Sequence, residues 1–229
     1  MSLAIAIFVK TPGFSPVKTR LAAELGIDAA EVFHRLAARA TAEVACACTA
    51  ASRIYWAVAE DDIRALDIWR GLAAIPQGAG ELGDRLDHVY RTLLQSHDRV
   101  LLIGADAPQL APAMLDRAAA VLEWQPYVMG PAADGGFWLF GGSRPVAASV
   151  WRGVAYSRPD TARTLAAALD PGSSIGWIDR LRDVDEIDDL RALDDALASS
   201  TDLLPAQREL RHWIESLPVR GRIGTTSPA

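Results

Sequence analysis

The sequence predicts an α/β protein of three layers, with helices on both faces of a central sheet. Short apolar runs alternate with amphipathic stretches along nearly the whole chain, which is the pattern of layered α/β domains. The first run, residues 4–9, is apolar on both faces, as a central strand of a parallel sheet is. No linker-like composition divides residues 1–217, so we expect one domain there and a disordered tail at 218–229, which is rich in Gly, Ser, Thr and Pro.

Six strands are expected, at residues 4–9, 53–58, 100–104, 127–130, 137–140 and 175–178. Between them, periodic patterns predict helices at about residues 16–25, 29–49, 61–70, 82–96, 112–124, 160–169, 186–198 and 205–216. Asp28 and Glu31 have the spacing of a capping box, and Pro112 suits a first helical turn. Asp183 and Asp185 directly precede a predicted helix and are expected to cap it.

Composition excludes several classes of protein. The 229 residues carry 23 Lys+Arg against 29 Asp+Glu, a formal net charge of −6, which argues against a nucleic-acid partner. No apolar run approaches the roughly 20 residues that span a bilayer. Cys46 and Cys48 are too few for a disulfide framework, and we expect them, like the four histidines, to have ordinary packing or surface roles. We therefore expect a bacterial-type cytoplasmic protein, whose oligomeric state the sequence leaves open.

The loop after the first strand is a candidate phosphate site. It is flanked by Lys10 and Lys18, the two lysines of the chain. The Ser-Pro pair at 15–16 predicts a helix start, which puts Lys18 and Arg20 in the first turns. Cations there oppose the helix dipole by roughly 0.3–1 kcal/mol each, a conflict that a bound phosphate would remove. Gly13 would let the backbone approach that phosphate; the alternative is a solvated basic loop.

A first acidic turn follows the apolar strand at 100–104. Asp106 lies just beyond the carboxyl end of this strand, where open α/β sheets bind their ligands. With a diphosphate nearby, its carboxylate could hold Mg²⁺ or Mn²⁺. The alternative is an aspartate that only stabilises the turn, since Asp is common in turns that contain proline.

A second acidic turn, Asp134-Gly135-Gly136, joins two short apolar strands. Asp-Gly is a strong hairpin signal, and a hairpin is the simpler explanation. The functional alternative is that the glycines make room for a ligand while Asp134 contacts a metal or a sugar hydroxyl. Trp138 follows this turn and could stack on a base or sugar, or simply pack in the core.

Together these segments resemble the bacterial GT-A-type glycosyltransferases associated with radical-SAM and selenium-related genes. The matching motifs are Phe8-Val-Lys-Thr-Pro-Gly13 with Val17-Lys-Thr-Arg-Leu21, Leu82-Gly-Asp-Arg85, Gly104-Ala-Asp-Ala-Pro108, Gly130-Pro-Ala-Ala-Asp-Gly-Gly136 and Asp183-Val-Asp-Glu-Ile-Asp-Asp-Leu190. This family is similar to nucleotide-diphospho-sugar transferases and to two kinds of guanylyltransferase, those that act on phospholactate and on the molybdenum cofactor. The resemblance implies a three-layer α/β/α fold with a mixed, mostly parallel sheet.

The resemblance also implies roles for residues. The loop from Lys10 to Arg20, including Gly13, Lys18 and Thr19, would hold nucleotide phosphates. Arg85 or Asp84 would lie near the nucleotide; the alternative is that residues 82–85 are a helix-start turn with a surface Arg–Asp pair. Asp106 would bind the metal, Mg²⁺ or Mn²⁺. Asp134 would be the acid on the sugar or acceptor side. Apart from the resemblance, we expect Asp134 to be a second metal ligand, and Gly135, Gly136 and Trp138 to contact substrate.

The chain departs from the family pattern at two of these motifs. The family's acid turn reads Gly-Ser-Asp-Cys-Pro, whereas Ala105 and Ala107 stand here in place of the serine and the cysteine. A Trp-Ser-Thr-like element is replaced by Ala155-Tyr-Ser-Arg158, on the acceptor side. The second position after Asp106 is Pro108, so the Asp-x-Asp motif of many glycosyltransferases of this fold is absent from this turn.

Three functions are consistent with these motifs and with the resemblance. The first is transfer of a glycosyl group from a nucleotide-diphospho-sugar with a divalent metal, in which Asp106 and Asp134 would be the catalytic acids. The second is guanylyltransferase-like nucleotidyl transfer, which releases pyrophosphate. The third is a nucleotide-binding module without catalysis, which the missing Asp-x-Asp motif favours.

Overall fold

The fold is built on a seven-stranded sheet in the computed structural model, which describes residues 1–169 and 174–217. The tail predicted at 218–229 lies outside the described residues. The strand order is β3-β2-β1-β4-β6-β5-β7, and only β6 runs antiparallel to its neighbours. The strands are β1 (Leu3–Val9), β2 (Arg53–Val58), β3 (Ala73–Pro76), β4 (Arg99–Gly104), β5 (Tyr127–Pro131), β6 (Phe137–Gly142) and β7 (Ile175–Trp177).

Strand β1 lies inside the sheet, as predicted, because its side chains are apolar toward both layers. It pairs in parallel with β2 on one side and with β4 on the other. Leu3, Ile5 and Ile7 pack into the core on one face, and Ala4 and Ala6 pack into the core on the other. The carboxyl ends of β1 and β4 therefore meet at one edge of the sheet.

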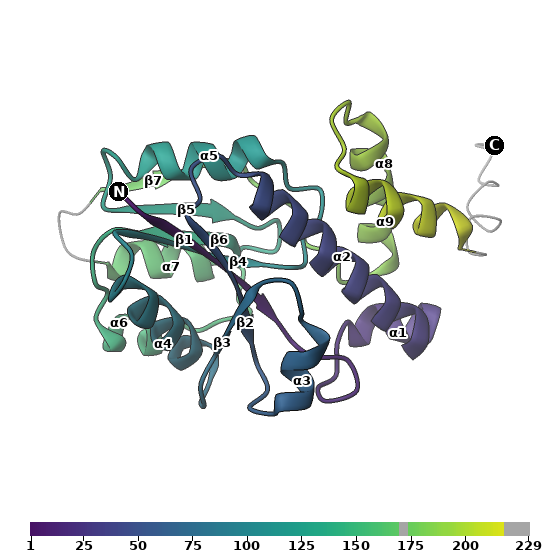
Figure 1. The fold of residues 1–229 in the computed structure, drawn as a ribbon, viewed down its shortest axis with the longest axis horizontal. Coiled ribbons are helices and arrows are strands. Elements are labelled where there is room, and N and C mark those ends of the chain that lie inside the picture. The colour runs from purple at the N-terminus through teal and green to yellow at the C-terminus, as the bar shows by residue number, and fades with distance from the viewer. Residues whose placement is uncertain (170–173, 218–229) are drawn as a thin grey trace.

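Helices cover both faces of the sheet, which confirms the predicted α/β/α layers (Figure 1). The long helix α2 (Ile27–Ala47) and α5 (Pro112–Val121) pack on one face. On the opposite face lie α4 (Leu82–Leu94), α6 (Ala148–Gly153) and α7 (Thr161–Ala168). The short helix α3 (Ile63–Ile68) follows β2.

A separate group of helices packs on α2, at the end of the molecule where the described chain finishes (Figure 1). These are α1 (Thr19–Leu25), α8 (Ile187–Ser199) and α9 (Pro205–Ser216). Their leucines and the ring of Phe33 form a third apolar cluster. This packing brings the segment before α8 to the carboxyl end of β4, where the backbone N–H of Val184 donates to the carbonyl of Asp106 at 2.9 Å.

The predicted strands and Pro112 at the start of α5 are confirmed, but two short elements were missed. Strand β3 has four residues and shows no alternation of apolar and polar side chains. Helix α6 has six residues, of which Trp151 is the buried one. Elements this short carry too few apolar positions for a period to be recognised.

Several predicted helix starts are wrong. Helix α1 begins at Thr19 rather than at 16, because Lys18 is its N-cap in the left-handed conformation, with φ 46°. Helix α2 begins at Ile27, so Asp28 lies inside its first turn and forms no capping box with Glu31. Asp183 and Asp185 do not cap α8: Glu186 is the N-cap.

Candidate functional site

A cavity of about 420 Å³ opens at the carboxyl edge of the sheet, where β1 and β4 end. This is the position at which open α/β sheets bind ligands. Its charged lining comes from the loop after β1, the turn after β4, the β5–β6 turn and the segment before α8. The residues on this polar side are Lys10, Lys18, His34, Asp106, Asp134, Asp183 and Asp185. The apolar part of the lining includes Phe8, Leu82, Leu86, Leu102, Phe137, Trp138 and Tyr156.

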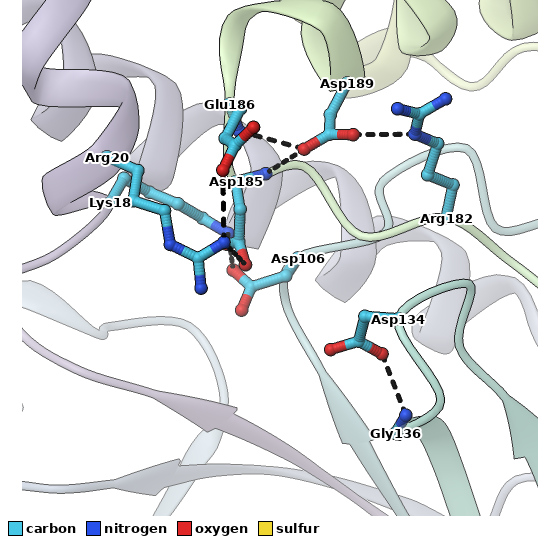
Figure 2. A network of polar contacts seen from close by, with 9 residues as sticks. All are labelled: Lys18, Arg20, Asp106, Asp134, Gly136, Arg182, Asp185, Glu186 and Asp189. Atoms are coloured by element: carbon cyan, nitrogen blue, oxygen red, sulfur yellow. Dashed lines mark hydrogen bonds and ion pairs between the residues drawn. The ribbon is translucent and has the colours of Figure 1, made fainter. Parts of the chain in front are cut away.

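Lys18 lies between two carboxylates (Figure 2). Its Nζ is 2.8 Å from Oδ1 of Asp106 and 3.1 Å from Oδ1 of Asp185, and its side chain is only 4% exposed. Burial alone would lower the pKa of Lys18, but the attraction of Asp106 and Asp185 outweighs burial and raises that pKa. Lys18 is therefore held as a charged ammonium inside the site, and the prediction that placed it within the first turn of a helix is wrong.

Asp106 stays ionised because positively charged side chains lie near it. Burial of its carboxyl group would raise the pKa, but Lys18, through charge and a hydrogen bond, lowers it below the usual value. Lys10 adds a smaller attraction. The Asp106 side chain remains 46% exposed, so the carboxylate is open to a ligand in the cavity as well as paired.

Asp183 is the carboxylate whose charge is least compensated. Burial and repulsion from Asp106 and Asp134 raise its pKa to about 7, and the attraction of Lys18 does not offset them. Burial is the main cause, and the negative charges of Asp106 and Asp134 add to it. Such crowding is what a site shows when its counter-ion is a ligand rather than a side chain.

The start of α8 fixes the segment that carries Asp183 and Asp185. The backbone N–H groups of Asp185 and Glu186 donate to Asp189 at 3.0 and 2.9 Å, and Arg182 donates to the same carboxylate at 2.6 Å (Figure 2). Together with the Val184–Asp106 hydrogen bond, these contacts tie the segment to the turn after β4.

The Asp134 turn is a hairpin and also part of the cavity wall. Strands β5 and β6 are antiparallel neighbours, and Oδ1 of Asp134 accepts from the N–H of Gly136 at 2.8 Å (Figure 2). Gly135 has φ +93°, and a Cβ there would collide with the carbonyl oxygen of Pro159. Glycine is thus needed at 135 for a close approach to the chain at Pro159.

The structure brings some of the predicted site residues together and leaves others apart. Lys10, Lys18, Asp106, Asp134, Gly136 and Trp138 line the cavity. Gly13, Thr19, Arg20, Arg85 and Gly135 do not. The guanidinium of Arg20 pairs with Glu186 at 3.4 Å and with Asp185, which lines the cavity, at 3.8 Å. Nε of Arg85 donates to the carbonyl of Gly80 at 3.0 Å. Trp138 is 4% exposed and its indole N–H donates to the carbonyl of Asp179 at 2.9 Å, so the indole is packed as well as facing the site.

Among the residues that line the cavity and that sequence reasoning missed are Asp183, Asp185, His34 and Gln77. Asp183 and Asp185 have a signal, because they form the Asp-x-Asp pattern that is absent after β4. His34 and Gln77 have none: one is on a helix and the other follows the unpredicted strand β3. The Gln77 amide donates to the carbonyls of Val9 and Ala57, which holds it at the ends of β1 and β2.

The charges of the lining suit a divalent cation. Two ammonium groups, on Lys10 and Lys18, face four carboxylates. Carboxylate oxygens are the ligands that Mg²⁺ and Mn²⁺ prefer, and burial together with the negative charges of Asp106 and Asp134, which a cation would offset, raises the pKa of Asp183. Among residues 1–169 and 174–217, no three His, Cys, Asp or Glu side chains are grouped to hold a metal by themselves, so a substrate or water would have to complete the coordination.

The fold is of the nucleotide-diphospho-sugar transferase-like class. A provisionally assigned nucleotide-diphospho-sugar transferase from Desulfovibrio desulfuricans G20 is similar over 94% of this chain and 98% of its own, with 25% identity and a TM-score of 0.79. The chain belongs to the bacterial family described as "Uncharacterized protein conserved in bacteria (DUF2064)", whose model matches residues 32–158.

Two further solved structures share the fold at lower identity. CMP:2-keto-3-deoxy-manno-octonic acid synthetase, solved with CTP, matches 86% of this chain and 99% of its own at 14% identity and a TM-score of 0.55. Rv0371c of Mycobacterium tuberculosis H37Rv, solved with manganese, matches 87% of this chain and 100% of its own at 16% identity and a TM-score of 0.53. No curated protein matches the sequence. No helix within the described parts of the chain is long and apolar enough to cross a bilayer.

Proposed function

We propose that the protein transfers a glycosyl group from a nucleotide-diphospho-sugar, with Mg²⁺ or Mn²⁺ bound in the cavity. The observation that carries this proposal is the convergence of Lys10, Lys18, Asp106 and Asp183 at the carboxyl edge of the sheet. A diphosphate alone would be repelled by the carboxylates, whereas a diphosphate that brings a cation would satisfy both kinds of charge.

Each residue of this group has a role that its surroundings support. Asp106 and Asp183 would hold the cation, which when bound would offset the negative charge on the leaving diphosphate. Lys10 is exposed and would bind phosphate oxygens directly. Lys18 is preorganised beside Asp106 and would stabilise the charge that grows on the diphosphate as the glycosyl bond breaks. Asp134, on the neighbouring turn, would face the sugar or the acceptor.

Nucleotidyl transfer is the second candidate. The synthetase with the same fold was solved with CTP, a nucleoside triphosphate, and the same lysines and carboxylates would suit a triphosphate. In that case pyrophosphate rather than a nucleoside diphosphate would leave. A non-catalytic nucleotide-binding module is the remaining outcome.

A ligand screen followed by a product assay tests the proposal. Thermal unfolding is measured with UDP, GDP, nucleoside triphosphates and nucleotide-sugars, each with and without Mn²⁺. A ligand at 100 times its Kd should stabilise the fold by about 2.7 kcal/mol, and we expect the largest shifts with Mn²⁺ and a diphosphate or nucleotide-sugar. Arg39→Met, which removes a surface cation paired with Glu209, should respond like the parent.

Products then separate the candidates. Release of a nucleoside diphosphate from a nucleotide-sugar supports glycosyl transfer, and release of pyrophosphate from a triphosphate supports nucleotidyl transfer. Tight binding with neither product would favour the non-catalytic module. If no nucleotide shifts unfolding, with or without Mn²⁺, the proposal is wrong.

A further inference from the structure

His34 is a buried histidine beside the cavity, and one of its ring nitrogens forms a hydrogen bond with the loop after β1. It is 6% exposed and lies on α2, and its Nε2 is 2.8 Å from the carbonyl oxygen of Lys10. A carbonyl oxygen only accepts hydrogen bonds, so Nε2 carries the proton and donates it. Nδ1 is then the unprotonated nitrogen, and it is buried without a hydrogen-bond partner among the described residues.

This arrangement keeps the ring neutral. Burial lowers the pKa of His34, and although Asp106 and the Lys10 carbonyl favour the charged form, Lys18 and Arg35 oppose it. A proton on Nδ1 would also enter a pocket where no described residue accepts it. Neutral His34 therefore keeps its Nε2–H donated to the carbonyl oxygen of Lys10.

Further side chains hold Thr11, the next residue of the loop. The Trp69 indole, whose ring meets the His34 ring edge-on with centroids 6.0 Å apart, donates to Oγ1 of Thr11 at 2.9 Å. The Thr11 N–H donates to the Glu60 carboxylate at 3.0 Å. Residues 10 and 11 are thus fixed from α2, from the end of α3 and from the chain after β2.

The Lys10 side chain needs such support more than Lys18 does. Lys18 is oriented by two carboxylates, whereas Lys10 forms no ion pair with any residue in 1–169 or 174–217 and is exposed on the cavity wall. Because no described carboxylate pairs with its ammonium group, the position of that group before a ligand binds depends strongly on the Lys10 backbone. The cost of ordering it on binding depends on how rigid that backbone is.

We infer that His34 is a positioning residue, which fixes the backbone at Lys10 so that the Lys10 ammonium group meets a phosphate of the substrate. The inference rests on the proposed function, because it needs a phosphate-bearing ligand in the cavity. Neither the family pattern nor the helical periodicity of α2 assigns this role to a histidine.

The test measures the affinity of UDP and GDP in the presence of Mn²⁺ for single and double variants. His34→Phe keeps an aromatic ring but cannot donate, and we expect it to weaken binding about tenfold. His34→Gln can donate its amide to the Lys10 carbonyl, and we expect it to restore most of the affinity. Lys10→Met should itself weaken binding, and in that background His34→Phe should change affinity less than twofold, because His34 acts through Lys10.

His97 supplies a matched control. Its Nε2 contacts the Tyr55 hydroxyl at 3.1 Å, its Nδ1 is likewise buried without a partner among the described residues, and it does not line the cavity. His97→Gln should therefore leave nucleotide affinity unchanged. Circular dichroism and thermal unfolding check that each variant folds, and if His34→Phe does not fold, His34→Asn with and without Lys10→Met replaces it, since the shorter amide cannot reach the carbonyl.

The outcomes separate this inference from the proposed function. If the parent binds none of the nucleotides and nucleotide-sugars of the screen, with or without Mn²⁺, both are overturned; if it binds one of them but neither UDP nor GDP, the affinities are measured with that nucleotide. If the parent binds and the His34 variants bind as well as His97→Gln does, only the inference is overturned. An equal loss on His34 substitution in the parent and in the Lys10→Met background would also overturn it, because the effect would then not pass through the lysine side chain.

Discussion

The turns that carry Asp106 and Asp134 both lie at the cavity, but they are held in different ways. Asp106 is paired with Lys18, and its carbonyl accepts from Val184, so both contacts come from segments distant in sequence. The Asp134 carboxylate accepts from Gly136, two residues away. The first turn is assembled by tertiary packing around a charge, whereas the second is a local hairpin that happens to border the cavity. Only the first has the surroundings of a group kept charged for a ligand.

The largest combined effect, on stability and on nucleotide affinity, is expected from Lys18→Met. It removes the ammonium group between Asp106 and Asp185 and leaves two carboxylates near Asp183. Because these carboxylates are 46% and 42% exposed and thus partly screened, we expect a loss of about 1–3 kcal/mol, which urea unfolding measures. Nucleotide affinity should also fall. Lys10→Met, at the exposed end of the loop, should leave stability within about 0.5 kcal/mol.

At the second turn, Gly135→Ala should destabilise through the backbone. A Cβ at φ +93°, in collision with the Pro159 carbonyl oxygen, forces the turn to move. We expect a loss of about 1–3 kcal/mol in urea unfolding. Gly153→Ala is the control, because a Cβ there meets nothing within 4 Å, and it should leave the free energy of unfolding unchanged. Equal stability of the two variants would show that the Asp134 turn is not packed on Pro159.

Asp183→Asn should change how stability depends on pH. In metal-free protein the pKa of Asp183 is about 7, above that of the unfolded chain, so the folded state binds more protons and this group costs stability as pH rises from about 4 to 7. The free energy of unfolding of the variant, measured with a chelator present, should therefore rise relative to that of the parent as pH increases from about 4 to 7. Added Mn²⁺ should stabilise the parent and not the variant. A constant difference between the two at pH 5 and 7.5 would contradict the crowding of carboxylates.

Trp138→Phe should have the smallest effect. It removes the hydrogen bond to the Asp179 carbonyl and keeps a ring in the same space, so stability should fall by about 0.5–1.5 kcal/mol. If the indole mainly packs, nucleotide affinity should stay within about twofold of the parent. A tenfold loss of affinity without a larger loss of stability would instead show that the indole stacks on the ligand.

The sheet could be predicted because its signals are local. The apolar run of β1 and the strand before Asp106 are long enough to recognise, and their parallel pairing places the two loops at one edge. The start of α1 could not be predicted in the same way. Ser15 and Pro16 are good helix-starting residues, but the left-handed Lys18 is held by Asp106 and Asp185, residues that only the fold brings near.

The site was predicted where its residues end strands and missed where tertiary packing supplies them. Asp106 follows β4 directly, and the sequence places it correctly at the cavity. Asp183 reaches the cavity because α8 and α9 pack on α2, and before a helix an aspartate looks like a cap. His34 faces the cavity from the middle of an amphipathic helix, where a buried histidine has the same pattern as any core residue.

The difference between the two aspartate turns is tested most directly by the effect of Mn²⁺ on nucleotide affinity. The ratio of the Kd for UDP or GDP without Mn²⁺ to that with Mn²⁺ is measured for the parent, Asp106→Asn and Asp134→Asn. Both substitutions keep the shape of the side chain and remove its charge. We expect the ratio to fall to about 1 in Asp106→Asn and to stay near that of the parent in Asp134→Asn. A ratio retained in Asp106→Asn, or lost equally in both variants, would contradict the assignment of Asp106 as the charged centre of the site.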